Sequence, residues 1–140
     1  MREIREVIFR GKRTDNGEWI EGSLLGIDWC DKPSTYSIAP NTPVSVFYSV
    51  LPETVGQYTG LTDKNGVRIF EGDIVHCVSK LDSADMVVIF ECGQFRMVLA
   101  EKYHEYQTNV GYYDINCFAK EVIGNIHDNP ELLQKNLDTT

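Results

Sequence analysis

No segment of this sequence is apolar for long enough to cross a membrane. The longest apolar stretches, such as residues 86–90, are five residues long, whereas a spanning helix needs about 20 apolar residues. The chain does not open with a charged stretch followed by an apolar run, so we expect no signal peptide. These absences predict a cytoplasmic protein that does not contact a membrane.

The spacing of a metal site is also missing. The four cysteines are far apart, form no Cys-x-x-Cys pair and have no adjacent histidine at the spacing of a zinc site. Two disulfides are formally possible, but a reducing compartment favours free thiols. We therefore expect no metal and no cofactor. The four ordinary thiols are Cys30, Cys77, Cys92 and Cys117.

Basic side chains are scarce outside the N-terminus. The net charge is −8, and residues 1–13 hold five basic side chains against two acidic ones, so the remaining chain carries −11. Binding to a nucleic acid needs a basic field, which most of this chain cannot supply. Three interpretations stay open for the basic segment: contact with a phosphate backbone, contact with an acidic patch of a neighbouring subunit, or a solvated edge strand. Its basic residues are Arg2, Arg5, Arg10, Lys12 and Arg13.

Alternation of apolar and polar residues dominates the N-terminal half, and helical periodicity is scarce. A tight hairpin turn is predicted at Asp15-Asn16-Gly17, because Asn and Gly accept the positive φ angles of such turns. Residues 26–43 contain three prolines, so we expect a long connection with at most a short strand over residues 36–38. The other predicted strands are residues 4–10, 18–25 and 44–50.

Short turns also separate apolar segments in the C-terminal half. Strands of five to seven residues joined by such turns are typical of a small closed barrel. Gly124, inside the last of them, indicates a bulge or a barrel corner. A short helix is predicted from Pro130, with Asp128 or Asn129 as its N-cap. The predicted strands are residues 67–70, 74–78, 86–91, 94–100 and 120–126.

No catalytic signature is present. The histidines, His76, His104 and His127, stand apart, and none belongs to a local Ser-His-Asp or Cys-His pattern. The glycines do not have the spacing of a phosphate-binding loop. We therefore predict that the chain is not an enzyme and has no catalytic residue. A small hydrolase that uses one histidine stays open as an alternative.

Aromatic residues gather in the long segment before the last strand. On the surface of a small barrel, such rings bind proline-rich peptides or stack nucleic-acid bases. The acidic neighbours Glu101, Glu105 and Asp114 favour a basic or neutral protein segment over a nucleic acid. The alternative is that the rings cover the barrel mouth or an oligomer interface. The candidate partner-binding residues are Tyr103, Tyr106, Tyr112 and Tyr113.

Five segments stand in an order that carries a resemblance. They are REVIFRGK from Arg5, DNGEWIEG from Asp15, PETVGQYTGL from Pro52, DKNGVRIFEGDIV from Asp63 and VIGNIHDNPELL from Val122. In this combination the sequence resembles the YopX family of phage and prophage proteins. The likeness covers nearly the whole chain and is weakest over residues 26–48. Leu51 and Cys92 depart from the family pattern, because acidic residues often occupy these two positions in the family.

The resemblance implies a mainly β protein with an N-terminal hairpin region, an SH3-like small β-barrel over residues 63–126 and a short C-terminal helix. We divide the chain into an N-terminal β subdomain, residues 1–62, and a barrel domain with the helix, residues 63–140. The resemblance also implies a phage-derived gene in a bacterial host, and it supplies no activity. We predict a non-enzymatic accessory protein that binds a protein partner or associates with itself. The further alternative is a nucleic-acid-associated protein that uses the basic N-terminus.

Overall fold

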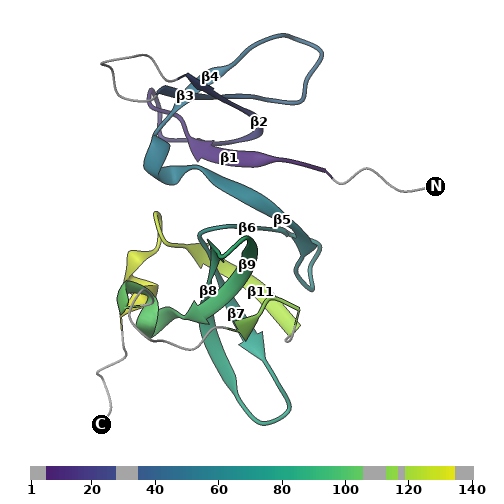
Figure 1. Ribbon diagram of the computed structural model, residues 1–140, viewed down its shortest axis with the longest axis vertical. Helices are drawn as coiled ribbons and strands as arrows, with labels where there is room; N and C mark the ends of the chain where they lie inside the picture. Colours follow the sequence, from purple (N-terminus) through teal and green to yellow (C-terminus); the bar gives the residue numbers. More distant parts are fainter. Residues whose placement is uncertain (1–5, 28–34, 106–112, 117–118, 135–140) are drawn as a thin grey trace, which may run out of the picture. The chain divides into compact units, whose positions relative to one another are not determined.

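The computed structural model describes residues 6–27, 35–105, 113–116 and 119–134 (Figure 1). These residues form eleven strands and three short 3-10 helices, so the prediction of a mainly β protein is confirmed. The chain divides into two compact units, Met1–Gly60 and Leu61–Thr140. None of the helices in the described part of the chain is long and apolar enough to cross a membrane.

Antiparallel pairing builds the first unit, in the strand order β4-β3-β2-β1-β5, in which β5 returns to pair with β1. The predicted hairpin at Asp15-Asn16-Gly17 is confirmed, because Gly17 has a φ of 73° and Lys12 pairs with Trp19 across the turn. The elements are β1 (Phe9–Lys12), β2 (Trp19–Ile27), β3 (Thr35–Ala39), β4 (Tyr48–Val50), the 3-10 helix η1 (Pro52–Thr54) and β5 (Gly56–Thr62).

The strand predicted over residues 44–50 is wrong in its first half. Only β4 is paired, and Val44 and Phe47 have exposed fractions of 64% and 63%. The N–H of Val46 donates to the carbonyl oxygen of Val44 at 3.0 Å, which turns the chain locally. Alternation gave this segment the pattern of a strand, but no strand in the described part of the chain pairs with its first half.

A five-stranded antiparallel sheet, in the order β10-β9-β8-β7-β11, builds the second unit. Most of the strands predicted from the short turns are confirmed, and β8 begins three residues earlier than expected. The elements are β6 (Arg68–Phe70), β7 (Asp73–Val78), β8 (Ser83–Glu91), β9 (Gln94–Leu99), the 3-10 helix η2 (Ala100–Glu105), β10 (Tyr113–Asp114), β11 (Ala119–Asn125) and the 3-10 helix η3 (Pro130–Leu133).

Both faces of this sheet are buried, and successive residues of one strand alternate between them. Val75 and Cys77 of β7 belong to a first cluster, whereas Ile74 between Asp73 and Val75 belongs to a second. The first cluster consists of Ile69, Val75, Cys77, Met86, Val88, Met97 and Ile115. The second consists of Ile74, Val87, Ile89, Val98, Ala100 and Leu133, from β7, β8, β9, η2 and η3.

A closed SH3-like barrel is not confirmed. The strand order of the five-stranded sheet begins with β10 and ends with β11, and these two strands do not pair with each other, so the sheet is open. The barrel was predicted from short strands joined by short turns, and an open sheet that is buried on both faces contains the same strands and turns. The bulge predicted at Gly124 is confirmed, because the register between β11 and β7 shifts between Val122 and Gly124.

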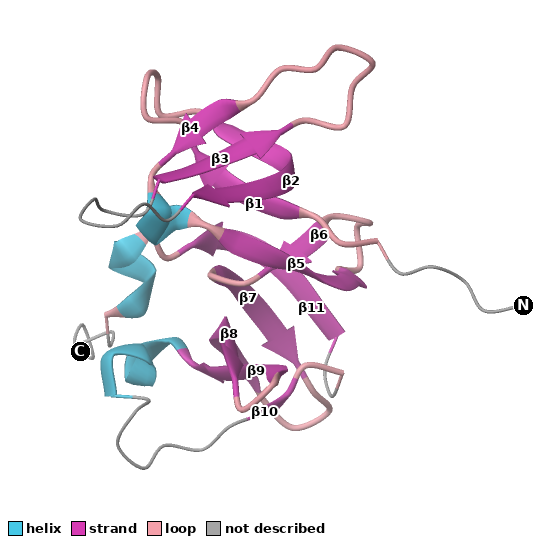
Figure 2. Cartoon of the chain, turned by 45° about the horizontal axis from the view of Figure 1, so that its top comes forward, coloured by secondary structure: helices cyan, strands magenta, loops and turns pink. Residues whose placement is uncertain are grey.

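The predicted C-terminal helix is a single 3-10 turn, η3, which is drawn in cyan in Figure 2. Pro130 stands at its start as expected, but Asn129 does not cap it. The side-chain oxygen of Asn129 instead accepts a hydrogen bond from the N–H of Asn125 at 3.2 Å. Because Leu133 is already buried in the second cluster, four residues are enough to place the apolar side chain of this segment.

Candidate functional site

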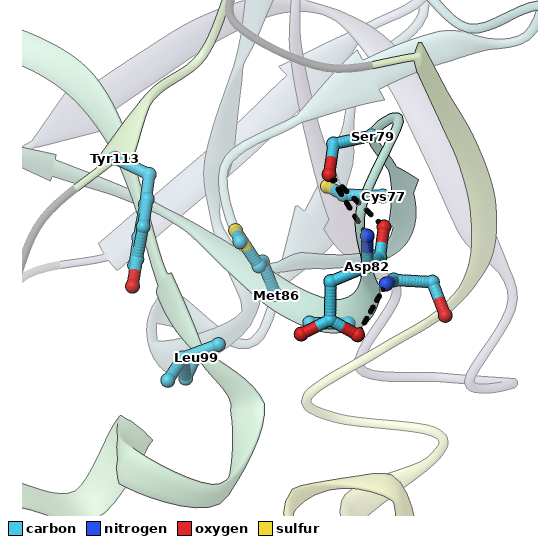
Figure 3. A pocket seen from close by; sticks show the side chains of 8 residues that line it. Cys77, Ser79, Asp82, Met86, Leu99 and Tyr113 are labelled. Atoms are coloured by element: carbon cyan, nitrogen blue, oxygen red, sulfur yellow. Dashed lines mark hydrogen bonds between the residues drawn. The ribbon is translucent and has the colours of Figure 1, made fainter.

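A pocket of 280 Å³ opens in the second unit, at the end of the β7–β8 hairpin (Figure 3). We call it the interaction pocket. Pockets for small molecules usually have volumes of about 300–1,000 Å³, so this one lies just below that range and suits a single side chain. Its lining residues are Cys77, Ser79, Asp82, Ser83, Ala84, Met86, Leu99 and Tyr113.

Apolar side chains of the first cluster form the inner wall of the pocket. Cys77 and Met86 are buried on adjacent strands, with Ala84 and Leu99 packed against the same cluster. Burial, assisted by the charge of Asp85, raises the pKa of the Cys77 thiol to about 11, although Lys120 opposes the shift. The thiol is therefore protonated at neutral pH, and Cys77 serves as an apolar wall rather than as a nucleophile.

The polar rim of the pocket is a tight loop, Ser79 to Asp82, that closes on itself. The N–H and the hydroxyl of Ser79 donate to the carbonyl oxygen of Asp82 at 2.8 and 3.1 Å. Oδ1 of Asp82 accepts from the N–H of Ser83 at 2.7 Å. These bonds hold the Asp82 carboxylate at the pocket edge, on the side facing Met86 in Figure 3. The rim therefore offers a fixed negative charge beside an apolar cavity.

The predicted tyrosine cluster is split in the described part of the chain. Tyr113 lies on β10 opposite Met97, packs on the first cluster and lines the interaction pocket. Tyr103 lies in η2, packs on the second cluster and meets the ring of His104 edge to face, with 5.4 Å between the ring centroids. Tyr106 and Tyr112 lie outside the described residues. Of the two described tyrosines, Tyr113 is the one that lines the pocket.

The predicted basic segment lies partly outside the described residues, which exclude Arg2 and Arg5. The described cations lie over aromatic rings of their own unit. The Arg10 guanidinium is 4.7 Å and the Lys12 ammonium 5.6 Å from the centroid of Trp19. The Arg13 guanidinium lies 4.1 Å from the centroid of Tyr48 and forms an ion pair of 2.6 Å with Asp15. These contacts give the three side chains structural roles within the first unit.

A histidine and two carboxylates lie in one row across three strands, an arrangement that the sequence analysis missed. Glu121 of β11 is opposite His76 of β7, which is opposite Asp85 of β8. Nδ1 of His76 and Oδ1 of Asp85 are 2.7 Å apart. Counting outward from the turn between Ser79 and Asp82 pairs position 76 with position 85, so the hairpin register was the signal that could have found this pair.

A second pocket of 250 Å³ lies beside His76 and Glu121. Oε2 of Glu121 is 3.5 Å from the ammonium of Lys64, which also lines this pocket. The six lining residues include no serine, threonine or cysteine: they are Lys64, His76, Val78, Ala119, Lys120 and Glu121. Among the residues that the structure describes, no group of three histidine, cysteine, aspartate or glutamate side chains is arranged to hold a metal ion.

Comparison with known proteins gives a family and a fold. The family model described as YopX protein matches residues 8–134. A crystal structure of protein EF1440 from Enterococcus faecalis is similar, with a TM-score of 0.52 and 25% identity, over 92% of this chain and 99% of that one. No curated protein matches. The solved structure supports the arrangement of strands, and its description states no activity.

Proposed function

The chain belongs to the YopX protein family, and from that premise we propose that it is a non-enzymatic accessory protein of a phage or prophage that binds a protein partner. In this proposal the protein acts in the cytoplasm of a bacterial host. The partner inserts one apolar side chain into the interaction pocket. The observation that carries the proposal is an apolar cavity of 280 Å³ with a fixed carboxylate, Asp82, at its rim.

The chemistry of the pocket defines the partner segment. Burying a side chain of the size of leucine or methionine contributes about 1.5–3 kcal/mol, and the apolar wall formed by Met86 and Leu99 provides that environment. Asp82 favours a lysine or arginine beside the apolar anchor. The net charge of −8 adds a long-range attraction for basic segments and opposes binding of nucleic acid. The proposed ligand is therefore a segment with an apolar anchor and an adjacent basic residue.

Selection from a random peptide display library tests this proposal. We expect the full chain to enrich peptides that carry an apolar anchor next to lysine or arginine. The Ala84→Leu variant adds three carbons inside the pocket and should lose these peptides by on the order of tenfold or more in affinity, because the anchor no longer fits.

A matched control for that experiment is Ala119→Leu, which adds the same three carbons to an exposed strand position of the same sheet, outside the interaction pocket. Circular dichroism and thermal unfolding establish that both variants fold. Enrichment of peptides that bind wild type and Ala84→Leu equally well would contradict the assignment of the pocket. Enrichment of acidic peptides would contradict the role given to Asp82.

The pair of His76 and Asp85 favours one second candidate, a small hydrolase. A carboxylate bonded to Nδ1 orients an imidazole so that Nε2 can accept a proton from a nucleophile or a water molecule. The 2.7 Å contact and the adjacent pocket of 250 Å³ fit the first part of that arrangement. Among the residues that the structure describes, the lining of this pocket supplies no hydroxyl or thiol nucleophile, which leaves water as the group to be activated there.

Hydrolysis of p-nitrophenyl acetate separates this candidate from the proposed function. We expect His76→Gln to change the rate no more than the control His104→Gln does. His104 is an exposed histidine that has no carboxylate partner among the described residues. General base catalysis contributes about 10²–10⁴-fold. A wild-type rate that falls by that factor in His76→Gln alone would establish the hydrolase instead.

A further inference from the structure

The loop between β7 and β8 carries a leucine that lies almost entirely in solvent. The exposed fraction of Leu81 is 96%, the largest among the exposed apolar side chains of the described residues. One exposed leucine is ordinary on a protein surface, so its surroundings decide whether it has a role. Here the same loop, through Ser79 and Asp82, forms the rim of the interaction pocket. An apolar projection and an apolar cavity therefore belong to one hairpin end.

Turn formation does not explain this leucine. Three other turns place a glycine at positive φ: Gly17 at 73°, Gly66 at 81° and Gly93 at 78°. In the Ser79–Asp82 loop the hydrogen bonds of Ser79 and Asp82 close the turn, and an apolar side chain at position 81 adds nothing to that closure. Glycine, asparagine or aspartate would serve a tight turn better. The leucine is therefore available for contact with another surface.

We propose that two copies of the chain associate by exchanging these loops, so that Leu81 of each copy enters the interaction pocket of the other. This inference rests on the proposed function, in which the pocket receives an apolar side chain, and it names a second copy as the partner. When one surface carries both a projection and a cavity, a twofold axis brings the projection of each copy to the cavity of the other. This is the geometry of an isologous dimer.

The charges that flank Leu81 complement themselves in such a dimer. Lys80 precedes Leu81 and Asp82 follows it, so the contact brings Lys80 of one copy toward Asp82 of the other, twice. Two copies with a net charge of −8 each repel one another over most of their surfaces. In the loop, by contrast, Lys80 and Asp82 stand on either side of Leu81, so association there forms pairs of opposite charge.

Sedimentation equilibrium of the full chain tests the exchange. We expect a wild-type dimer, and we expect Leu81→Asp to raise its dissociation constant by on the order of 100- to 10,000-fold, because each dimer buries two leucine side chains and each contributes about 10- to 100-fold. Val44→Asp adds the same charge at another exposed apolar position, with an exposed fraction of 64%, and should leave the constant unchanged. A wild-type monomer at millimolar concentration, or equal effects of the two substitutions, would overturn the proposal.

Reversal of the charges provides a second readout that does not depend on an apolar substitution. Lys80→Glu and Asp82→Lys should each weaken the dimer, because each places like charges opposite one another. The double variant Lys80→Glu/Asp82→Lys restores opposite charges and should recover most of the wild-type affinity. Absence of recovery in a folded double variant would overturn the predicted pairing.

Failure of the exchange and failure of the proposed function have different signatures. The Leu81→Asp variant keeps its pocket, and the Ala84→Leu variant keeps its Leu81. A mixture of the two should therefore form a heterodimer with a lower dissociation constant than the homodimer of either variant. If the wild-type chain is monomeric but display peptides still lose affinity for Ala84→Leu, the exchange is overturned and the proposed function stands. If Ala84→Leu changes neither the dissociation constant of the dimer nor the affinity for the peptides, both proposals are overturned.

Discussion

Replacing Asp63 with alanine is expected to lower the stability of the second unit by about 3 kcal/mol, because three backbone N–H groups lose a charged acceptor at once. Oδ1 of Asp63 accepts from Asn65 and Val67 at 2.8 and 2.9 Å, and Oδ2 accepts from Val122 at 2.9 Å. The side chain is buried, with an exposed fraction of 7%. One carboxylate thus closes the turn after β5 and ties it to β11.

The same contacts predict a dependence on pH. Burial alone would raise the pKa of Asp63, but the N–H groups of Val122, Val67 and Asn65, with the charge of Lys64, outweigh burial and lower it below the ordinary value of 3.8. The folded chain therefore binds this proton less readily than the unfolded chain does. The contribution of Asp63 is fully present above about pH 4 and is lost as the pH falls through the lowered pKa.

Amide hydrogen exchange of β7 and β8 measures this loss of stability, because these strands form the centre of the sheet. Asp63→Asn serves as the reference without a titrating group, and its difference from wild type should shrink below about pH 4. Asp114→Asn is the control, since Asp114 is exposed and, within the described part of the chain, its side chain accepts hydrogen bonds only from Asn116, two residues away. Equal exchange rates in Asp63→Ala and Asp114→Asn would contradict the role of Asp63.

Local signals in the sequence carried the prediction of turns. The turn at Asp15-Asn16-Gly17 was predicted from its residues alone, and Gly17 has the expected positive φ. Cys92 departs from the family pattern, yet it adopts a φ of 53° before Gly93 and completes a tight turn. Such turns depend on the residues within them, so four letters of sequence are enough to predict them.

Predictions that depended on distant partners were less successful. Residues 44–47 alternate like a strand, but a strand also needs a neighbour, and the sequence does not say where that neighbour is. The closed barrel failed for the same reason, since alternation does not state whether the first and last strands of a sheet meet.

The candidate sites show the same division. The sequence singled out Tyr113 and His76 as residues with suitable chemistry. Their surroundings come from other strands: Met86 and Leu99 complete the interaction pocket, and Asp85 completes the histidine pair. Register decides both groupings, and a shift of one residue would send every one of these side chains to the opposite face.

Replacing Gly22 with alanine is expected to have the largest effect on the first unit. A Cβ atom at Gly22 would lie 2.0 Å from the carbonyl oxygen of Ala39 and 2.9 Å from the Cα of Pro40. Both are backbone atoms, so no side-chain rotation relieves the clash, and β2 and β3 have to separate. That movement breaks the pairing of Leu24 with Ile38, whose side chain is fully buried. We expect a destabilisation above about 4 kcal/mol, at the extreme of single substitutions.

Urea unfolding in a Trp29→Phe background, followed by the fluorescence of Trp19 on β2, measures this effect in the first unit. Ser23→Ala is the matched control: it replaces the next residue of the same strand at an exposed position and should change the free energy of unfolding by less than about 0.5 kcal/mol. Gly22→Ala should either shift the midpoint far below that of the control or show the unfolded fluorescence without urea. Because the clash arises only where β2 and β3 approach in the register that pairs Ser23 with Ala39, equal midpoints for the two variants would mean that this register is wrong.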